Sequence, residues 1–237
     1  MMYKRILAVG LTAVMAIGVS VSASVSAGAS VFASIPSIVP VARDYHAESY
    51  SVVTISRTEP TMLTNEQLQT LAETAPDIYE TRSALIMPGR RVTDDELAAW
   101  SDEYWELGGL NAFELEVIRL INIERAARHL QPLAVDPLLS MAARFHSTEM
   151  ADFQFFGHAS PNHGRGVYRA EMFGHENIQE HVWGVRENIA GSTRIPERVV
   201  QLWMDSPGHR AAILEAEFLT IGVGAVRGGG TTAKFGS

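Results

Sequence analysis

The sequence has 237 residues, of which 46% are hydrophobic and 19% are charged, and its formal net charge is −8. This composition argues against a wholly disordered chain, and the acidic balance argues against a nucleic-acid partner. The absence of cysteine excludes disulfides, thiolate metal sites and catalytic thiols. Any metal ion would have to be held by histidine and carboxylate side chains.

The start of the chain has the features of a secretory signal peptide. Lys4 and Arg5 precede an apolar run over residues 6–21, and small residues continue to Ala33. A basic start, an apolar stretch and small residues near a cleavage point are typical of exported proteins. We predict a signal peptide over residues 1–33 and a secreted, extracellular protein with no stable membrane span after cleavage. A retained membrane anchor is the alternative.

Residues 34–92 are predicted to form a partly disordered spacer that contains one short helix. Residues 34–60 mix Ser, Val, Thr and Pro without a helical period. Thr64 and Gln67 then suit a capping box at the start of a helix that Pro76 ends.

A second helix is predicted within residues 93–109. Thr93 and Glu96 form another capping box, and Trp100 and Tyr104 share one apolar face at helical spacing. Such a face needs a partner surface, so we expect this helix to dock on the main domain. Alternatively, the acidic segment over residues 60–109 is a functional arm that binds a partner or covers the cleft of the main domain.

Residues 110–237 are predicted to form the main domain, which has more helix than strand. Pro137 and Pro196 stand at first helical positions, where a missing amide hydrogen costs nothing. The predicted helices cover 111–129, 137–153, 168–173 and 196–203, with another from Pro207, and the predicted strands cover 218–226 and a segment ending near 235. The fold class is therefore α+β, with helices covering a sheet.

Some side chains in these elements can be assigned to the interior or the surface. Arg125 is predicted to point outward from the first helix of the domain, whereas Trp203 and Met204 are predicted to lie in the core. Gly222 and Gly224 interrupt a strand pattern and are interpreted as positions of close packing or a bulge.

Several common enzyme motifs are absent. His175 and Glu176 begin like a helical zinc-protease motif, but the next histidine, His181, is six residues away from the first and leaves its helix face. There is no nucleophile elbow and no phosphate-binding loop.

What remains is a group of histidines and glutamates in the main domain, where seven of the eight histidines lie between residues 129 and 209. His158 follows a helix end. His209 lies in the first turn of a helix that Ser206 caps, where the helix dipole lowers the pKa of an imidazole. Two such histidines and one carboxylate could hold a divalent cation with open positions for water.

Three stretches together resemble the CAP superfamily, also called SCP, and most closely its cysteine-free bacterial secreted branch. They are residues 156–161 (FGHASP), 187–191 (ENIAG) and 203–210 (WMDSPGHR). Three further elements of the sequence support this resemblance: Asn122 with Arg125, residues 130–136 (LQPLAVD) and residues 146–151 (HSTEMA). These pieces occur in the order of the family and span slightly more than half of the chain.

The resemblance implies a three-layer α-β-α sandwich, here with an N-terminal helical extension, and a central cleft with two histidines and two glutamates. In some family members that cleft binds a divalent metal. By position, His158 and Glu187 match the first cleft histidine and the glutamate of the Glu-Asn-Ile-Ala motif, and His209 matches the histidine of the bacterial Ser-Pro-Gly-His-Arg motif. Ser206 stands where the second glutamate is expected. The closing family pattern is weak in residues 231–236, so an altered or poorly paired final strand is expected.

The predicted binding cleft comprises His158, Glu187, His209, His146 and Asn188. His158 and His209 are the predicted ligands of a divalent metal such as zinc. His146 could instead be a core residue with satisfied hydrogen bonds, and Asn188 could tie down adjacent backbone.

The predicted function is that of a non-enzymatic extracellular module that binds a small ligand, a cell-envelope component or a divalent metal. The alternative is a metal-dependent hydrolase in which His158 and His209 hold the metal and Glu187 is the catalytic base. The oligomeric state is not predicted.

Overall fold

The computed structural model describes residues 53–175, 184–191 and 193–237. The chain divides into two units, residues 1–49 and 50–237, and the described residues all belong to the second. The predicted signal peptide over residues 1–33 and His181 lie outside the described residues. Within the described ranges, no helix combines the length and apolar character needed to cross a membrane.

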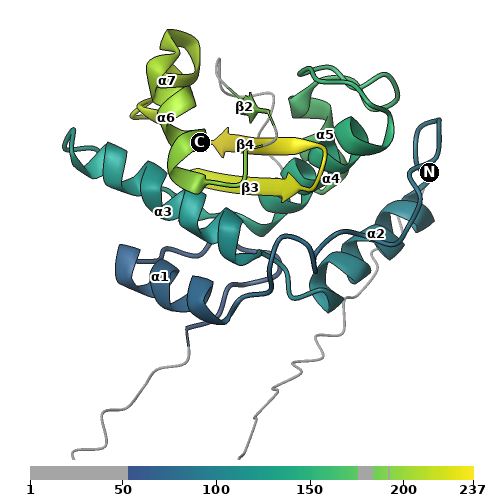
Figure 1. Cartoon of the computed structure of the whole chain (residues 1–237), viewed down its shortest axis with the longest axis horizontal. Coiled ribbons are helices and arrows are strands. Elements are labelled where there is room, and N and C mark those ends of the chain that lie inside the picture. Colours follow the sequence, from purple (N-terminus) through teal and green to yellow (C-terminus); the bar gives the residue numbers. More distant parts are fainter. Residues whose placement is uncertain (1–52, 176–183, 192) are drawn as a thin grey trace, which may run out of the picture. The chain divides into compact units, whose positions relative to one another are not determined.

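Helices and strands follow one another much as the sequence predicts (Figure 1). The helices are α1 (Asn65–Thr74), α2 (Asp94–Glu106), α3 (Ala112–Ala126), α4 (Pro137–Asp152), α5 (Gly166–Met172), α6 (Pro196–Asp205) and α7 (Pro207–Ile213). The strands are β1 (Ala134–Val135), β2 (Arg186–Ala190), β3 (Thr220–Val226) and β4 (Gly230–Gly236). All the predicted helices are present, as are both predicted strands. The strands β1 and β2 were not predicted, because one has two residues and the other begins with polar side chains.

The four strands form one sheet in the order β1-β3-β4-β2. Strand β4 pairs with β3 on one side and with β2 on the other, antiparallel to both. The expectation of an altered or poorly paired final strand is therefore wrong. The pairing register sets Glu187 opposite Lys234 and Asn188 opposite Ala233.

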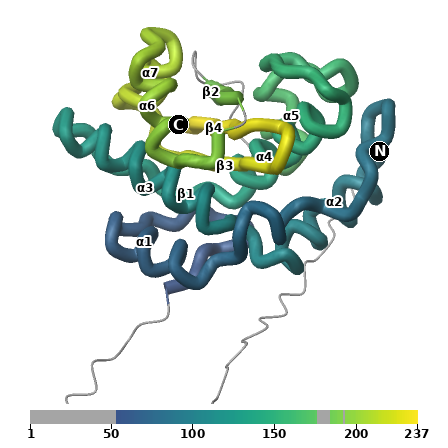
Figure 2. The backbone as a smooth tube through the Cα atoms, in the orientation of Figure 1, coloured from purple at the N-terminus to yellow at the C-terminus, as the bar shows by residue number. Residues whose placement is uncertain are grey.

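Helices cover both faces of this sheet, which confirms the predicted α-β-α sandwich. Helices α4 and α5 contact one face, while α3, α6 and α7 contact the other (Figures 1 and 2). Because successive side chains of a strand point to opposite faces, each strand supplies side chains to both helical layers.

Two glycines of β3 let α4 approach the sheet closely, as predicted for these positions. A Cβ atom on Gly222 would lie 2.1 Å from the backbone nitrogen of Ser140, and one on Gly224 would lie 1.9 Å from that of Arg144. No larger residue fits between the strand and the helix backbone without moving one of them.

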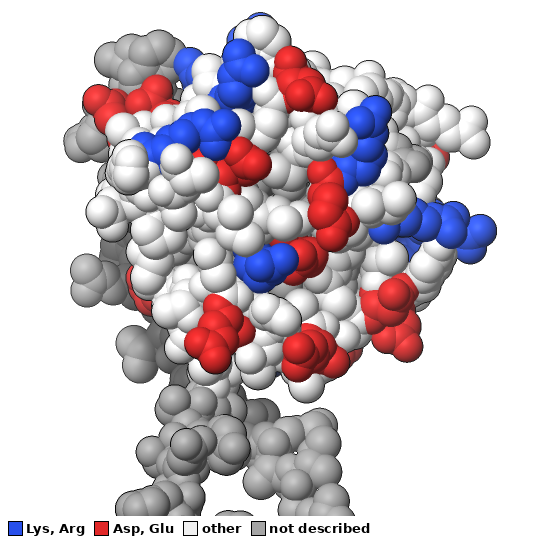
Figure 3. All heavy atoms as spheres, turned by 60° about the vertical axis from the view of Figure 1, so that its left-hand side comes forward, with Lys and Arg blue, Asp and Glu red and all other residues white. Residues whose placement is uncertain are grey.

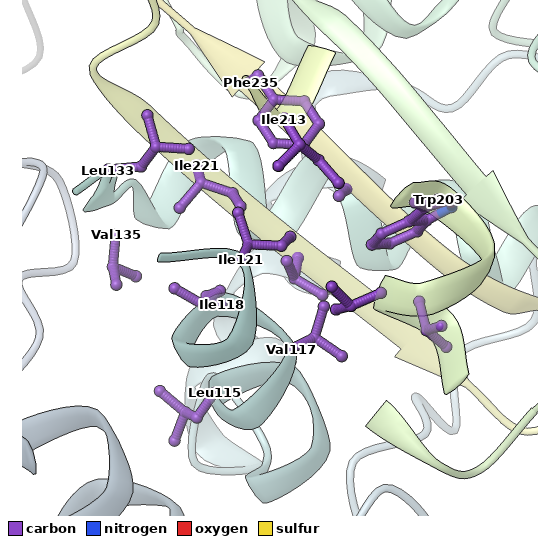
Figure 4. Close-up of a cluster of buried hydrophobic side chains, with 14 of the residues drawn as sticks. Leu115, Val117, Ile118, Ile121, Leu133, Val135, Trp203, Ile213, Ile221 and Phe235 are labelled. Atoms are coloured by element: carbon purple, nitrogen blue, oxygen red, sulfur yellow. The ribbon is translucent and has the colours of Figure 1, made fainter. Parts of the chain in front are cut away.

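The main hydrophobic core lies between β3, β4 and the layer of α3 and α6 (Figure 4). Ile118 and Ile121 of α3 pack toward Ile221 and Phe235 of the sheet, and all four are fully buried. Trp203 is also buried, and its indole Nε1–H donates to the carbonyl of Ile189 at 3.1 Å. The prediction that Trp203 belongs to the core is confirmed.

Arg125 is buried, so its predicted outward orientation is wrong. Its guanidinium donates to the carbonyls of Gln131, Ile213 and Glu215, each at 2.8 Å, and to that of Phe218 at 3.3 Å. These four hydrogen bonds to backbone carbonyls compensate for the free-energy cost of burying the charged guanidinium. Arg125 thus ties α3 to the segment that connects α7 to β3.

The segment before the main domain packs on it from residue 53 onward. Thr61 exchanges two backbone hydrogen bonds with Val135 of β1, at 2.8 and 2.9 Å. Helix α1, which begins with the predicted capping box of Thr64 and Gln67, lies beside α3 (Figure 2). The backbone of Thr61 thus pairs with the edge of the sheet at β1, and Leu68 of α1 belongs to the main hydrophobic core.

Helix α2 packs against α4 through an aromatic cluster. It begins with the predicted capping box of Thr93 and Glu96. The ring of Trp100 lies 5.5 Å from that of Phe145 and 5.6 Å from that of Phe173, in both cases edge to face. Edge-to-face rings attract each other beyond the effect of buried area alone, so these contacts stabilise the packing of α2 on the main domain.

Candidate functional site

Glu187 of β2 is the centre of a cluster of charged side chains, and only 6% of its side chain is exposed. Lys234 Nζ donates to Glu187 Oε2 at 2.6 Å from the neighbouring strand. Arg169 Nη2 of α5 donates to the same oxygen at 2.8 Å. Two buried cations therefore hold one buried carboxylate, an arrangement that keeps the carboxylate ionised.

This environment shifts the pKa values of both strand residues. Burial by itself would raise the pKa of Glu187, but the charges of Lys234 and Arg169 and the hydrogen bond from His158 lower it well below its ordinary value. Burial lowers the pKa of Lys234 to about 8, against the opposing effect of Glu187. A carboxyl group of such low pKa binds a proton poorly at neutral pH.

His158 is the exposed member of the cluster. It lies in the loop that follows α4, and its Nδ1 is 3.1 Å from Glu187 Oε1. More than half of its side chain, 53%, is exposed to solvent. The carbonyl of His158 also accepts a hydrogen bond from Arg169, at 3.0 Å. The loop is thus held in place while the imidazole is free to meet a ligand.

His146 lies beneath this loop and is fully buried. Its Nε2 is 2.9 Å from the carbonyl of Gly157, to which it donates, and 3.8 Å from Glu187 Oε1. Burial lowers the pKa of His146, which favours the neutral imidazole. His146 therefore supports the loop that carries His158 and does not reach the surface.

A second carboxylate, Glu149 of α4, forms a neighbouring buried cluster that sequence reasoning missed. It accepts hydrogen bonds from His163 Nδ1 at 2.6 Å and from the hydroxyl of Ser160. Burial would raise its pKa, but its polar contacts with His146, His163 and Ser160 lower it to about 2. The opposite nitrogen of His163 accepts from the amide of Val92 at 3.0 Å, so this cluster also fixes the segment before α2.

Asn188 lies next to Glu187 in sequence, but its side chain points to the other face of the sheet. Its Nδ2 donates to the carbonyl of His209 at 3.0 Å. The two-residue period of a strand makes this unavoidable once Glu187 faces α5. Asn188 therefore positions the start of α7.

His209 is half-buried in the first turn of α7. Burial lowers its pKa, and the charge of His158 lowers it further. Ser206 occupies the N-cap position, but its side chain makes no capping hydrogen bond. The pKa of His209 is thus lowered, as the sequence predicts, and the causes are burial and the charge of His158.

The residues around Glu187 do not fit a divalent metal. Both carboxylate oxygens of Glu187 already accept hydrogen bonds from cationic or imidazole groups, and the position of the second family glutamate is Ser206. Within the described ranges, no group of three or more histidines and carboxylates is placed to share an ion. Two fixed cations beside Glu187 would also repel a divalent ion.

Arg169, Lys234 and Glu149 are the cluster members that the sequence did not reveal. Lys234 offered one usable signal, because it is a lone charged residue in a strand of small and apolar side chains. A buried lysine in a central strand needs a carboxylate partner. Nothing in the local sequence of Arg169 or Glu149 distinguishes them from surface residues of a helix.

Two curated proteins of Bacillus subtilis (strain 168) are similar to this chain. The uncharacterized protein YkwD is 42% identical over 120 residues, which is 51% of this chain and 45% of that protein. The uncharacterized membrane protein YlbC is 32% identical over 129 residues, which is 54% of this chain and 36% of that protein. The matched stretch therefore spans less than half of either relative.

Similar solved structures include an extracellular SCP-domain protein from Bacillus anthracis, which is 30% identical to this chain, with a TM-score of 0.49. The match covers 57% of this chain and 43% of the chain of that protein. An outer surface protein from Borrelia burgdorferi is 17% identical with a TM-score of 0.46, over 63% of this chain and 98% of its own.

The family model described as the cysteine-rich secretory protein family, CAP, matches residues 118–235. This stretch contains the strand of Glu187, the histidines His158 and His209 and all of β3. The chain therefore belongs to the CAP family, through a domain that spans residues 118–235.

Proposed function

We propose that this protein is an exported, non-catalytic CAP-domain module whose ligand contacts the imidazoles of His158 and His209. The observation that carries the proposal is the neutralisation of Glu187 by Lys234 and Arg169. A carboxylate held by two cations is a rigid support for the neighbouring imidazole, and it is a poor proton acceptor. Export is supported by the signal-peptide features of residues 1–33.

The hydrolase alternative has less support from this geometry. It needs a metal ion on His158 and His209 and a basic carboxylate at Glu187. The low pKa of Glu187 opposes the second requirement, and the two fixed cations beside it oppose the first.

We infer that the ligand is a component of the cell envelope with hydroxyl or amide groups. An exposed neutral imidazole can both donate and accept a hydrogen bond, and the depressed pKa of His209 favours this neutral form. Sugars and peptides of a cell wall offer the complementary groups.

Cosedimentation of the purified protein with cell-wall sacculi of Bacillus subtilis tests the proposal. We expect the wild type to sediment with the sacculi, and the double variant His158→Ala, His209→Ala to bind at least about tenfold more weakly. His129→Asn is the matched control, because His129 is exposed at the end of α3 and has a positive φ of 59° that asparagine tolerates.

Three results would overturn the proposal. These are the absence of cosedimentation, an equal loss of binding in His129→Asn, and the release of soluble wall fragments by the wild type but not by Glu187→Gln. The last result would establish catalysis and make Glu187 its base.

A further inference from the structure

A second candidate site lies at the end of the sheet away from Lys234, where β2 and β3 end and β4 begins. A cavity of about 220 Å³ is lined there by Tyr79, Thr193, Arg194, Arg227 and Thr231, among others. These residues come from three segments that are far apart in the sequence: the turn after α1, the loop before α6 and the β3–β4 hairpin.

Two arginines in this cavity share one aromatic ring. The guanidinium carbon of Arg194 lies 5.2 Å from the centroid of the Tyr79 ring, and that of Arg227 lies 5.6 Å from it. A guanidinium that contacts a ring with its face keeps the N–H donors at its edge available. The ring of Tyr79 thus brings two guanidinium groups together within cation–π distance.

Neither guanidinium has a carboxylate within ion-pair distance in the described part of the chain. The acidic residues that flank Tyr79 in sequence bond within their own turn, since Asp77 accepts from the amide of Tyr79 and Glu80 from the amide of Asp77, both at 2.9 Å. Some other arginines do have such a partner, as in Arg119 with Glu116 and Arg128 with Glu124. On the face seen in Figure 3, basic and acidic side chains are interspersed. The two arginines on the ring of Tyr79 thus concentrate positive charge at one place in an acidic chain.

The backbone that carries Arg227 is constrained. Gly228 and Gly230 have φ values of +88° and +80°, and a Cβ atom on Gly230 would lie 2.3 Å from the carbonyl oxygen of Ala190. The hairpin is therefore tight and lies directly against the end of β2, which limits the positions open to Arg227.

We propose that this cavity is a binding site for a doubly charged tetrahedral oxyanion, such as the phosphate group of a phosphorylated sugar or polyol. Two guanidinium forks can each bind two oxygens of such a group, and its two negative charges balance the two arginines. The hydroxyls of Thr193 and Thr231 line the same cavity and add neutral hydrogen-bonding groups. The site is separate from the Glu187 cluster and independent of the function proposed for it.

Titration of the purified protein with sodium phosphate at constant ionic strength tests this inference, with the arginine Nε–H signals in NMR spectra as the readout. We expect the signals of Arg194 and Arg227 to shift together and to saturate. Arg194→Gln and Arg227→Gln should each weaken binding about tenfold, which is the effect of losing one charged hydrogen-bonding partner.

Arg198→Gln is the matched control, because Arg198 is exposed on α6, its guanidinium donates to the side chain of Gln201 at 3.1 Å, and it is not among the residues that line the cavity. Its affinity for phosphate should equal that of the wild type. The inference is wrong if the shifts stay linear with concentration, if Arg198→Gln weakens binding as much as Arg194→Gln, or if acetate at the same ionic strength binds as tightly as phosphate.

Discussion

Lys234 and Glu187 face each other across adjacent antiparallel strands, with Nζ and Oε2 2.6 Å apart and both side chains almost fully buried. The lysine also donates to the carbonyl of Gly166 at 3.0 Å, which joins the start of α5 to the sheet. The pair of Lys234 and Glu187 thus fixes the glutamate of the Glu-Asn-Ile-Ala motif. It also fixes α5, the helix that carries Arg169, the second cation beside Glu187.

Replacement of Lys234 by methionine should destabilise the domain. Removal of one partner from a buried ion pair leaves the other charge with less compensation and costs about 3 kcal/mol or more. Urea denaturation at pH 7 would measure this loss. Arg128→Met, which removes the cation of the exposed pair between Arg128 and Glu124, should change the free energy of unfolding much less. Equal effects of the two substitutions would show that the Lys234 pair has no special role.

Glu149 should make the protein sensitive to acid. Its pKa of about 2 in the folded state is below the value near 4.3 expected in the unfolded chain. Its contribution is therefore fully present above about pH 4.3 and is lost as the pH falls toward 2, by about 3 kcal/mol in total. Chemical denaturation between pH 3 and pH 7 should show a steeper decline for the wild type than for Glu149→Gln. Parallel curves would contradict this assignment.

Gly224→Ala should be among the most damaging single changes in the domain. The new methyl group would overlap the backbone of Arg144, so β3 and α4 must separate, at a cost of about 3 kcal/mol or more. Gly208→Ala is the control, since a Cβ atom there meets nothing within 4 Å and alanine favours the helix. Thermal unfolding should show a large decrease in Tm for the first variant and no decrease for the second.

The local chemistry of the chain predicts most of the helices correctly. The capping boxes at Thr64 and Thr93 and the prolines at residues 137 and 196 mark helix starts, because each satisfies or removes free amides of a first turn. These signals depend on neighbours in sequence, and tertiary contacts do not alter them.

The charge network depends on long-range pairing and is much harder to predict. Arg169 and Lys234 become partners of Glu187 only when α5 and β4 pack beside β2. The sequence pattern of α3 makes Arg125 look like a surface residue, yet its side chain is buried. Backbone carbonyls at the end of α7 and in the segment after it accept its hydrogen bonds. The sequence predicts Asn188 either in the cleft or as a tie to nearby backbone, and only strand pairing shows that its side chain lies on the face opposite Glu187 and donates to the carbonyl of His209.

The interaction between His158 and His209 can be measured directly. Because the charge of His158 lowers the pKa of His209, the substitution His158→Gln should raise that pKa toward its ordinary value. NMR titration of the imidazole signals of His209 in the wild type and the variant would show the shift. An unchanged pKa would mean that the two imidazoles do not share a site.

The protonation of Glu187 is the most direct test of the account, and it can be followed through the ¹³C signal of its carboxyl group, assigned with Glu187→Gln. If Lys234 and Arg169 neutralise this carboxylate, its signal will stay constant from about pH 7, where Lys234 is still protonated, down to about pH 4.5, below the range where a catalytic base titrates. A titration of Glu187 between about pH 6 and pH 7 would contradict the account and identify the residue as a base suited to catalysis.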